Sequence, residues 1–248
     1  MDELVYHHYS ELHSENAVAI VGFPSLGLVS SIATSFLAKQ LELDLVGAVS
    51  SSSFPPYTVI QNGVPVPPVR FYGGCRKTDE GCDGGIECDD LYIITSEFVP
   101  KTELMDSMAE LIVEWCQRNN VRTVITLDGI PVFSPDTYSI IGVGSTEYAR
   151  SMMNKYDIDT FDDGMVRGLS GLILMKAVDA DLDVITLLGS ARQDVPDPKG
   201  AAKLMEPLTR LLPELKVDTE PLYQEADDID RRMQGQEMHQ YRSQDIYG

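Results

Sequence analysis

The stretch AVAIVGFPSLGLVSSIATSFLAKQL, residues 17–41, decides the fold class. Its first five residues are all apolar, which is typical of a strand that is buried on both faces. A turn bounded by Gly22 and Gly27 follows, and apolar residues then recur at helical spacing, namely Leu28, Val29, Ile32, Ala33, Phe36 and Leu37. A strand, a tight turn and a helix are the opening unit of an α/β protein.

The same alternation continues as far as residue 217. Apolar runs predict further strands at residues 45–52, 90–96, 121–127, 138–144 and 183–188. Helical patterns lie between or after them, from residue 102 onward and at residues 146–154, 164–180 and 199–212. Strands that alternate with helices predict a mostly parallel central sheet with helices on both faces.

Three segments of different character make up the chain. Residues 1–16 are expected to form a polar N-terminal arm, and residues 17–217 a single α/β domain. Residues 218–248 are expected to hold an amphipathic helix that ends near Gly235, followed by a tail. Within the domain, the proline-rich segment 54–74 predicts edge strands or extended arms, which serve either as subunit contacts or as a cover over the core.

The composition excludes several classes of function. The formal net charge of −20 argues against nucleic acid as a partner, because binding to a polyanion depends on clustered Lys and Arg. The sequence shows neither a membrane-spanning run nor a signal peptide, so a cytoplasmic protein is expected. Cys75, Cys82 and Cys88 are spaced too widely for paired zinc ligands, so no metal and no cofactor are expected.

The turn after the first strand raises the question of nucleotide binding. Gly22 and Gly27 have the spacing of the two glycines of a phosphate-binding P-loop. That motif also requires Lys and Ser or Thr after the second glycine, whereas this chain has Leu28 and Val29. The sequence therefore favours a structural turn over a phosphate site.

A crevice beside this turn is the place where an enzyme of this class would act. In parallel sheets, ligands bind beyond the carboxyl ends of the strands, and the residues expected there are Gly22, Ser25, Gly27, Glu97 and Asp128. The domain contains no histidine, which removes the commonest general base. The two carboxylates are equally suitable as loop or cap residues. A hydrolase or phosphorylase for a small nucleoside-like molecule is therefore the alternative hypothesis, and a protein without catalytic activity is favoured.

Several motifs, taken in order, resemble the PAC2 family of proteasome assembly chaperones and their archaeal homologues. These are residues 20–29 (IVGFPSLGLV), the block from DLYIITSEFVP to LIVEWC, the strand 123–129, residues 168–173 (GLSGLI) and residues 196–202 (PDPKGAA). The resemblance implies a non-catalytic α/β fold related to nucleoside-phosphorylase-like domains. It also implies an ATP-independent action on proteasome α-subunits by a homo-oligomer, expected in the trimer to pentamer range, in an archaeal cytoplasm.

The last three residues, Ile246, Tyr247 and Gly248, resemble the hydrophobic-Tyr-any motif with which proteasome activators and assembly factors dock between α-subunits. Ile246 can bury apolar surface, and Tyr247 combines a rigid ring with a hydroxyl group. The carboxylate after Gly248 can pair with a lysine. The sequence does not distinguish between assembling proteasomes and activating finished ones.

Overall fold

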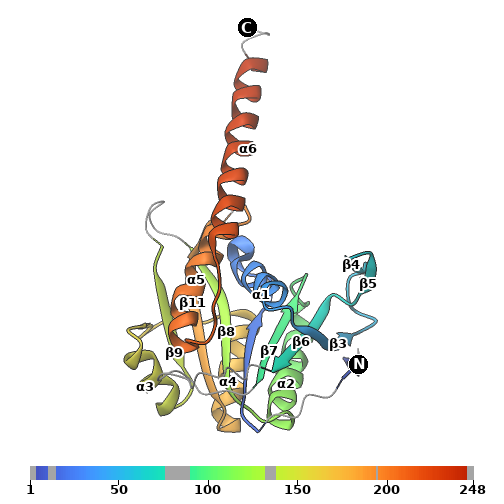
Figure 1. Cartoon of the computed structure of the whole chain (residues 1–248), viewed down its shortest axis with the longest axis vertical. Coiled ribbons are helices and arrows are strands. Elements are labelled where there is room, and N and C mark those ends of the chain that lie inside the picture. The colour runs from blue at the N-terminus through green and yellow to red at the C-terminus, as the bar shows by residue number, and fades with distance from the viewer. Residues whose placement is uncertain (1–3, 11–14, 76–89, 132–137, 194, 245–248) are drawn as a thin grey trace.

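Figure 1 shows the computed structural model of the chain, in which residues 4–10, 15–75, 90–131, 138–193 and 195–244 are described. Nine strands form one mixed sheet in the order β1-β3-β6-β7-β2-β8-β11-β9-β10. Their bounds are β1 Val5–His8, β2 Ala17–Gly22, β3 Asp44–Ser50, β6 Val69–Cys75, β7 Asp90–Ser96, β8 Val121–Pro131, β9 Ile140–Gly144, β10 Asp159–Thr160 and β11 Asp183–Ala191.

The four central strands β7, β2, β8 and β11 run parallel, and the flanking strands are mostly antiparallel. The α/β class and the parallel centre are thus confirmed. All residues of β2 and β7 are buried, as expected for strands that are covered on both faces. In β2, Val18 and Ile20 face one side of the sheet, whereas Ala17, Ala19 and Val21 face the other, so two cores form.

Helices cover both faces of the sheet. The core that contains Val18 and Ile20 is closed by α1 (Val29–Gln40), α3 (Glu147–Lys155) and α5 (Pro198–Leu211). The other core is closed by α2 (Thr102–Arg118) and α4 (Gly168–Ala180). A short 3-10 turn, η1 (Leu26–Leu28), connects β2 to α1.

The structure adds detail at two borders of the domain and corrects the expected end of the C-terminal helix. Of the two alternatives for the proline-rich segment, an edge strand is not found at its end, because β6 lacks proline and pairs with both β3 and β7. In the N-terminal arm, β1 pairs with β3, and Tyr6 packs against the core. The C-terminal helix α6 (Glu220–Gln244) does not end near Gly235 but continues for nine more residues.

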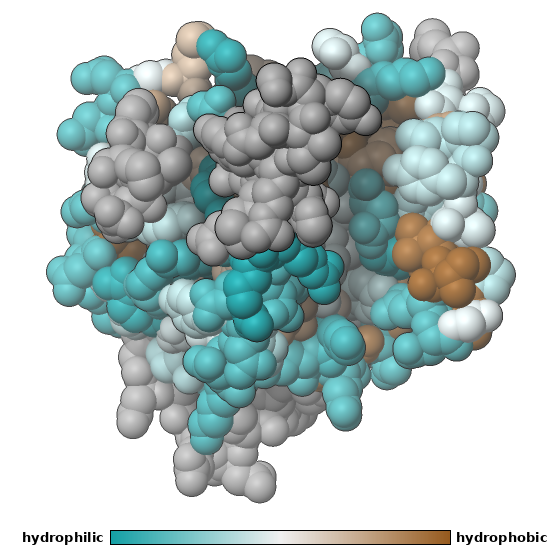
Figure 2. Space-filling view, turned by 90° about the horizontal axis from the view of Figure 1, so that it is seen from above, coloured by the Kyte–Doolittle hydropathy of each residue, from teal (hydrophilic) through white to brown (hydrophobic). Residues whose placement is uncertain are grey.

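Outside the main sheet, β4 (Val59–Gln61) and β5 (Val64–Val66) form a two-stranded hairpin. Ile60 is 63% exposed and Val64 is 58% exposed. Figure 2 shows a hydrophobic patch on the side of the molecule where Figure 1 places this hairpin. The hairpin is therefore an apolar projection, as expected for an extended arm of the proline-rich segment.

The described residues contain no group of three or more His, Cys, Asp or Glu side chains placed to hold a metal ion. No described helix combines the length and the apolar character needed to cross a bilayer. Cys82 and Cys88 lie outside the described residues. Cys116 on α2 is buried, and this burial raises the pKa of its thiol.

Candidate functional site

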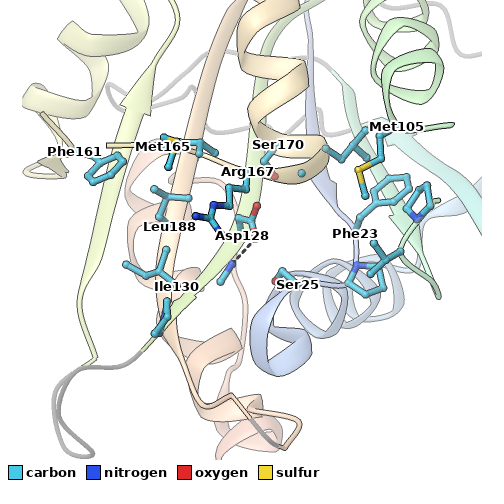
Figure 3. Close-up of a pocket in the computed structure, with 18 of the residues that line it drawn as sticks. Phe23, Ser25, Met105, Asp128, Ile130, Phe161, Met165, Arg167, Ser170 and Leu188 are labelled. Carbon is cyan, nitrogen blue, oxygen red and sulfur yellow. Dashed lines mark hydrogen bonds between the residues drawn. The ribbon is translucent and has the colours of Figure 1, made fainter. Parts of the chain in front are cut away.

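A cavity of about 650 Å³ lies at the carboxyl ends of β2, β8 and β11, where sheets of this class bind ligands. Its walls come from the loop after β2, the start of α2, the end of β8 and the segment that leads into α4. Figure 3 shows these side chains, with Ser25 and Asp128 facing the same space. We call this space the switch-point cavity.

Asp128 is the carboxylate of the switch-point cavity. It lies near the end of β8 and is followed in the same strand by Gly129 and Ile130, which also line the cavity. Its Oδ1 accepts a hydrogen bond of 2.8 Å from the backbone N–H of Gly129, and the Ser170 hydroxyl donates a second one. Burial raises the pKa of Asp128, and these two hydrogen bonds oppose the increase. The carboxylate keeps acceptor positions for a ligand.

Ser25 also lines the cavity, but it is not arranged as a nucleophile. Its hydroxyl is hydrogen-bonded to the Ser30 hydroxyl, and Ser30 donates in turn to the backbone carbonyl of Phe23 at 2.6 Å. Serine nucleophiles are activated by a general base within hydrogen-bonding distance, usually an imidazole. In the described structure Ser25 contacts another serine instead, so the serine pair ties the loop to α1.

Gly22 and Gly27 have structural roles. A Cβ atom on Gly22 would lie 2.5 Å from the carbonyl oxygen of Ser30, so β2 approaches α1 too closely for any side chain. Gly27 has a φ of +60°, and a Cβ there would lie 2.8 Å from the carbonyl oxygen of Arg192. Neither glycine is among the residues that line the cavity. The structural interpretation of this turn is therefore supported.

Glu97 is not part of the crevice, which corrects the expectation from sequence. It follows β7, and its carboxylate forms an ion pair with Arg70 on the neighbouring strand β6. The backbone N–H of Glu97 also donates to the carbonyl of Pro68 at 3.1 Å. The Arg70 side chain is only 5% exposed, so Glu97 neutralises a buried charge.

Replacing Glu97 with Ala is expected to destabilise the protein by about 1–3 kcal/mol, because the Arg70 guanidinium would stay buried without its counter-ion. The partial exposure of Glu97 keeps this value below that of a fully buried pair. Urea unfolding followed by circular dichroism measures the change. Glu110→Ala, at an exposed position of α2, is the matched control and should change the stability by less than about 0.5 kcal/mol. Equal values for the two variants would show that the Arg70 pair contributes nothing.

Sequence reasoning missed the residues that α4 and the preceding loop bring to the cavity. Arg167, which stands at the N-cap position of α4, and Ser170 in its first turn both line the space. Phe161 and Met165 add apolar walls, and Met165 is 75% exposed. The only signal in the sequence was the glycine-containing turn before α4, which showed where this helix begins but not what it faces.

The second candidate site is the C-terminal tripeptide, and residues 245–248 lie outside the described residues. The helix that precedes it can be described. Leu222 and Ala226 near the start of α6 are buried, and Arg192 Nη1 contacts Asp230 Oδ1 at 2.6 Å. Beyond these contacts α6 rises away from the body of the protein (Figure 1).

Comparison with known proteins gives consistent results. The PAC2 family model matches residues 19–237. The structure of PbaA from Pyrococcus furiosus, an archaeal homolog of proteasome-assembly chaperone, is 33% identical, with a TM-score of 0.82 over 98% of this chain and 96% of that chain. A curated uncharacterized protein from Methanocaldococcus jannaschii is 29% identical over 94% of this chain and 90% of its own length. PbaB from P. furiosus, an archaeal proteasome activator, is 22% identical and shares the fold, with a TM-score of 0.78 over 96% of this chain and all of PbaB.

Proposed function

We propose that this chain, which belongs to the PAC2 family, acts on the proteasome as an assembly chaperone or as an activator. In this proposal it does so without hydrolysing ATP. The observation that carries the proposal is the likeness to PbaA of P. furiosus, which extends over almost the full length of both chains. The TM-score of 0.82 indicates that the two chains share the same overall fold. We therefore infer that proteasome α-subunits are the partner of this cytoplasmic protein.

The contact with the α-subunits is made, in this proposal, by Ile246, Tyr247 and Gly248. The 25 residues of α6 span about 37 Å, and the helix ends four residues before the end of this chain. A helix that leads away from the domain is suited to carry a docking tail, because a partner can bind the tail without a steric clash with the α/β domain. Burial of Ile246, the ring and hydroxyl of Tyr247, and pairing of the terminal carboxylate with a lysine supply the affinity.

In this proposal the protein forms a homo-oligomer in the trimer to pentamer range, so that several copies of the tail act together. The exposed apolar hairpin β4–β5 supports such an assembly, since Ile60 and Val64 would lose contact with water on association. Linked tails that engage one ring raise the overall affinity far above that of a single tail.

The test is binding of the purified protein to a 20S proteasome and to its free α-subunits, by surface plasmon resonance. Full-length protein should bind, and Tyr247→Ala should weaken binding by more than about tenfold, because each tail loses its aromatic anchor and the loss multiplies across copies. Deletion of residues 246–248 should abolish binding. Tyr241→Ala, a tyrosine six residues upstream on α6, is the matched control and should bind as the unmodified protein does.

Folding is measured in the same variants. Deletion of residues 246–248 should leave the melting temperature and the oligomeric mass unchanged, because no core pattern of the sequence extends to these residues. Binding that is equal in the Tyr247→Ala and unmodified proteins would refute the tail as the contact. A large fall in melting temperature on deletion would show that the tail serves the fold instead.

The alternative of a nucleoside-like hydrolase or phosphorylase has less support. Of its three polar candidates, Ser25 and Asp128 share a cavity, whereas Glu97 is paired with Arg70 elsewhere. A cavity with a carboxylate and hydroxyl groups is better suited to holding a ligand than to attacking one, since Ser25 contacts Ser30 and not a base.

A further inference from the structure

The switch-point cavity has a polar centre between two apolar walls. Figure 3 shows Asp128, Arg167, Ser170 and Ser25 around the middle of the space. On one side lie Phe23 and Met105, and on the other lie Ile130, Phe161, Met165 and Leu188. Cavities of about 300–1,000 Å³ with apolar walls and a few fixed polar groups are typical ligand sites. The volume of about 650 Å³ falls within this range.

The polar centre carries both signs of charge. Asp128 supplies a carboxylate near the end of β8, and Arg167 supplies a guanidinium before α4. Among the described residues, neither side chain takes part in an ion pair with another residue. The first turn of α4 also lacks an acidic side chain, so the positive end of this helix is left without a counter-charge there.

These charges select a zwitterionic ligand. A phosphate-bearing molecule would gain from Arg167 but would be repelled by the Asp128 carboxylate in the same space. A molecule with an ammonium group and a carboxylate can pair with both side chains at once. Ser25 and Ser170 add hydroxyl groups that can bond to an amide.

The two walls define the rest of the ligand. In an extended peptide, successive side chains point to opposite sides of the backbone. A dipeptide therefore presents its backbone to the polar centre and one side chain to each apolar wall. We propose that the switch-point cavity binds a short peptide with free termini and two apolar side chains. The ammonium group faces Asp128, and the carboxylate faces Arg167. The proposal uses only residues that line the cavity and does not depend on the proteasome-directed function.

Isothermal titration calorimetry on the full-length protein tests the proposal with Leu-Leu as the probe. Leu-Leu should bind, and Gly-Gly should bind at least about tenfold more weakly because it leaves both apolar walls uncovered. N-acetyl-Leu-Leu-amide keeps the side chains but lacks both charges, and it should also lose at least about tenfold in affinity. Failure of Leu-Leu to bind, or equal binding of the three probes, would overturn the proposal.

Two variants connect any binding to this cavity. Asp128→Asn and Arg167→Gln should each weaken Leu-Leu binding by about tenfold, since each removes one charge-assisted hydrogen bond. Arg122→Gln changes an exposed arginine at the opposite end of β8 and serves as the matched control, with unchanged affinity expected. Circular dichroism of each variant checks the fold. Binding that survives both cavity variants in folded protein would show that the peptide binds elsewhere.

Discussion

Replacing Asp197 with Ala is expected to destabilise the protein by about 3–5 kcal/mol, because several polar groups lose their shared partner at a buried position. Asp197 is fully buried before the first turn of α5. Its carboxylate accepts hydrogen bonds from the backbone N–H of Gly200 at 3.0 Å and of Arg192 at 2.9 Å. The Tyr138 hydroxyl donates to the same carboxylate at 2.9 Å.

The expected loss of stability in Asp197→Ala is larger than the loss of the N-cap of α5 alone would cause. A helix N-cap alone contributes about 1 kcal/mol. The Asp197 carboxylate also joins the start of α5 to Arg192 and to Tyr138, whereas the bond from its backbone N–H to the carbonyl of Gly27 at 2.8 Å would remain in the variant. Arg192 in turn contacts Asp230 on α6, so this network holds the base of the helix that leads to the C-terminus. We therefore expect the Asp197→Ala variant to loosen α6 as well as α5.

Guanidinium unfolding followed by circular dichroism measures this prediction. Asp197→Asn is the informative companion variant, because it keeps an oxygen that can accept from Gly200 while losing the charge that faces Arg192. It should cost about 1–2 kcal/mol, less than the alanine variant. A loss of under about 1 kcal/mol for Asp197→Ala would mean that water replaces the carboxylate at this site, and the network would then not hold α6.

The sequence predicted the parallel centre of the sheet because its strands are apolar on both faces and therefore appear as continuous apolar runs. It failed where tertiary contacts decide the structure. The segment of β1 reads as polar because His7 and His8 are in it, yet Tyr6 packs against Phe71 and the strand completes the edge of the sheet. Gly235 lies within α6, since one glycine costs only about 1 kcal/mol in a helix whose other residues favour it.

Part of the candidate site was also predicted, because the sequence located the parallel strands whose carboxyl ends form it. Ser25 follows β2, and Asp128 lies near the end of the parallel neighbouring strand β8, so the rule about carboxyl ends places both at one edge of the sheet. Glu97 also follows a parallel strand, but β6 lies beside it and supplies Arg70 as a partner. The sequence left open whether the segment before β7 forms an edge strand or an extended arm, and it did not show that β6 would pair antiparallel with β7. Arg167 belongs to a loop, and its place depends on how α4 packs, which no local pattern encodes.

Replacing Trp115 with Ala is expected to destabilise the protein by about 3–5 kcal/mol, the usual cost of removing a large aromatic side chain from a core. Trp115 on α2 is 7% exposed and lies between two rings of the sheet. Its ring centroid is 4.9 Å from that of Phe71 and 4.8 Å from that of Tyr92, the latter in an edge-to-face arrangement. Its side chain also hydrogen-bonds Tyr6 of β1.

The Trp115→Ala substitution should destabilise the edge of the sheet as well as the core. Without Trp115, Tyr6 loses a hydrogen bond and a ring contact of 6.2 Å, so the pairing of β1 with β3 should weaken. Tyr92 is almost fully buried, and burial raises its pKa to about 12. A cavity beside it would admit water to its hydroxyl group and lower this pKa towards the ordinary value. Ultraviolet titration of the tyrosines can follow that change.

Trp115→Phe is the control, because it keeps an aromatic ring between Phe71 and Tyr92 and should cost only about 1–2 kcal/mol. Far-ultraviolet circular dichroism must report the unfolding, since Trp115 is the only tryptophan of the chain and the variants lack its fluorescence. Hydrogen exchange of the amides in β1 measures the effect on the edge strand. Protection of β1 that is equal in Trp115→Ala and the unmodified protein would show that its backbone pairing with β3 suffices, and that Tyr6 adds no measurable anchor.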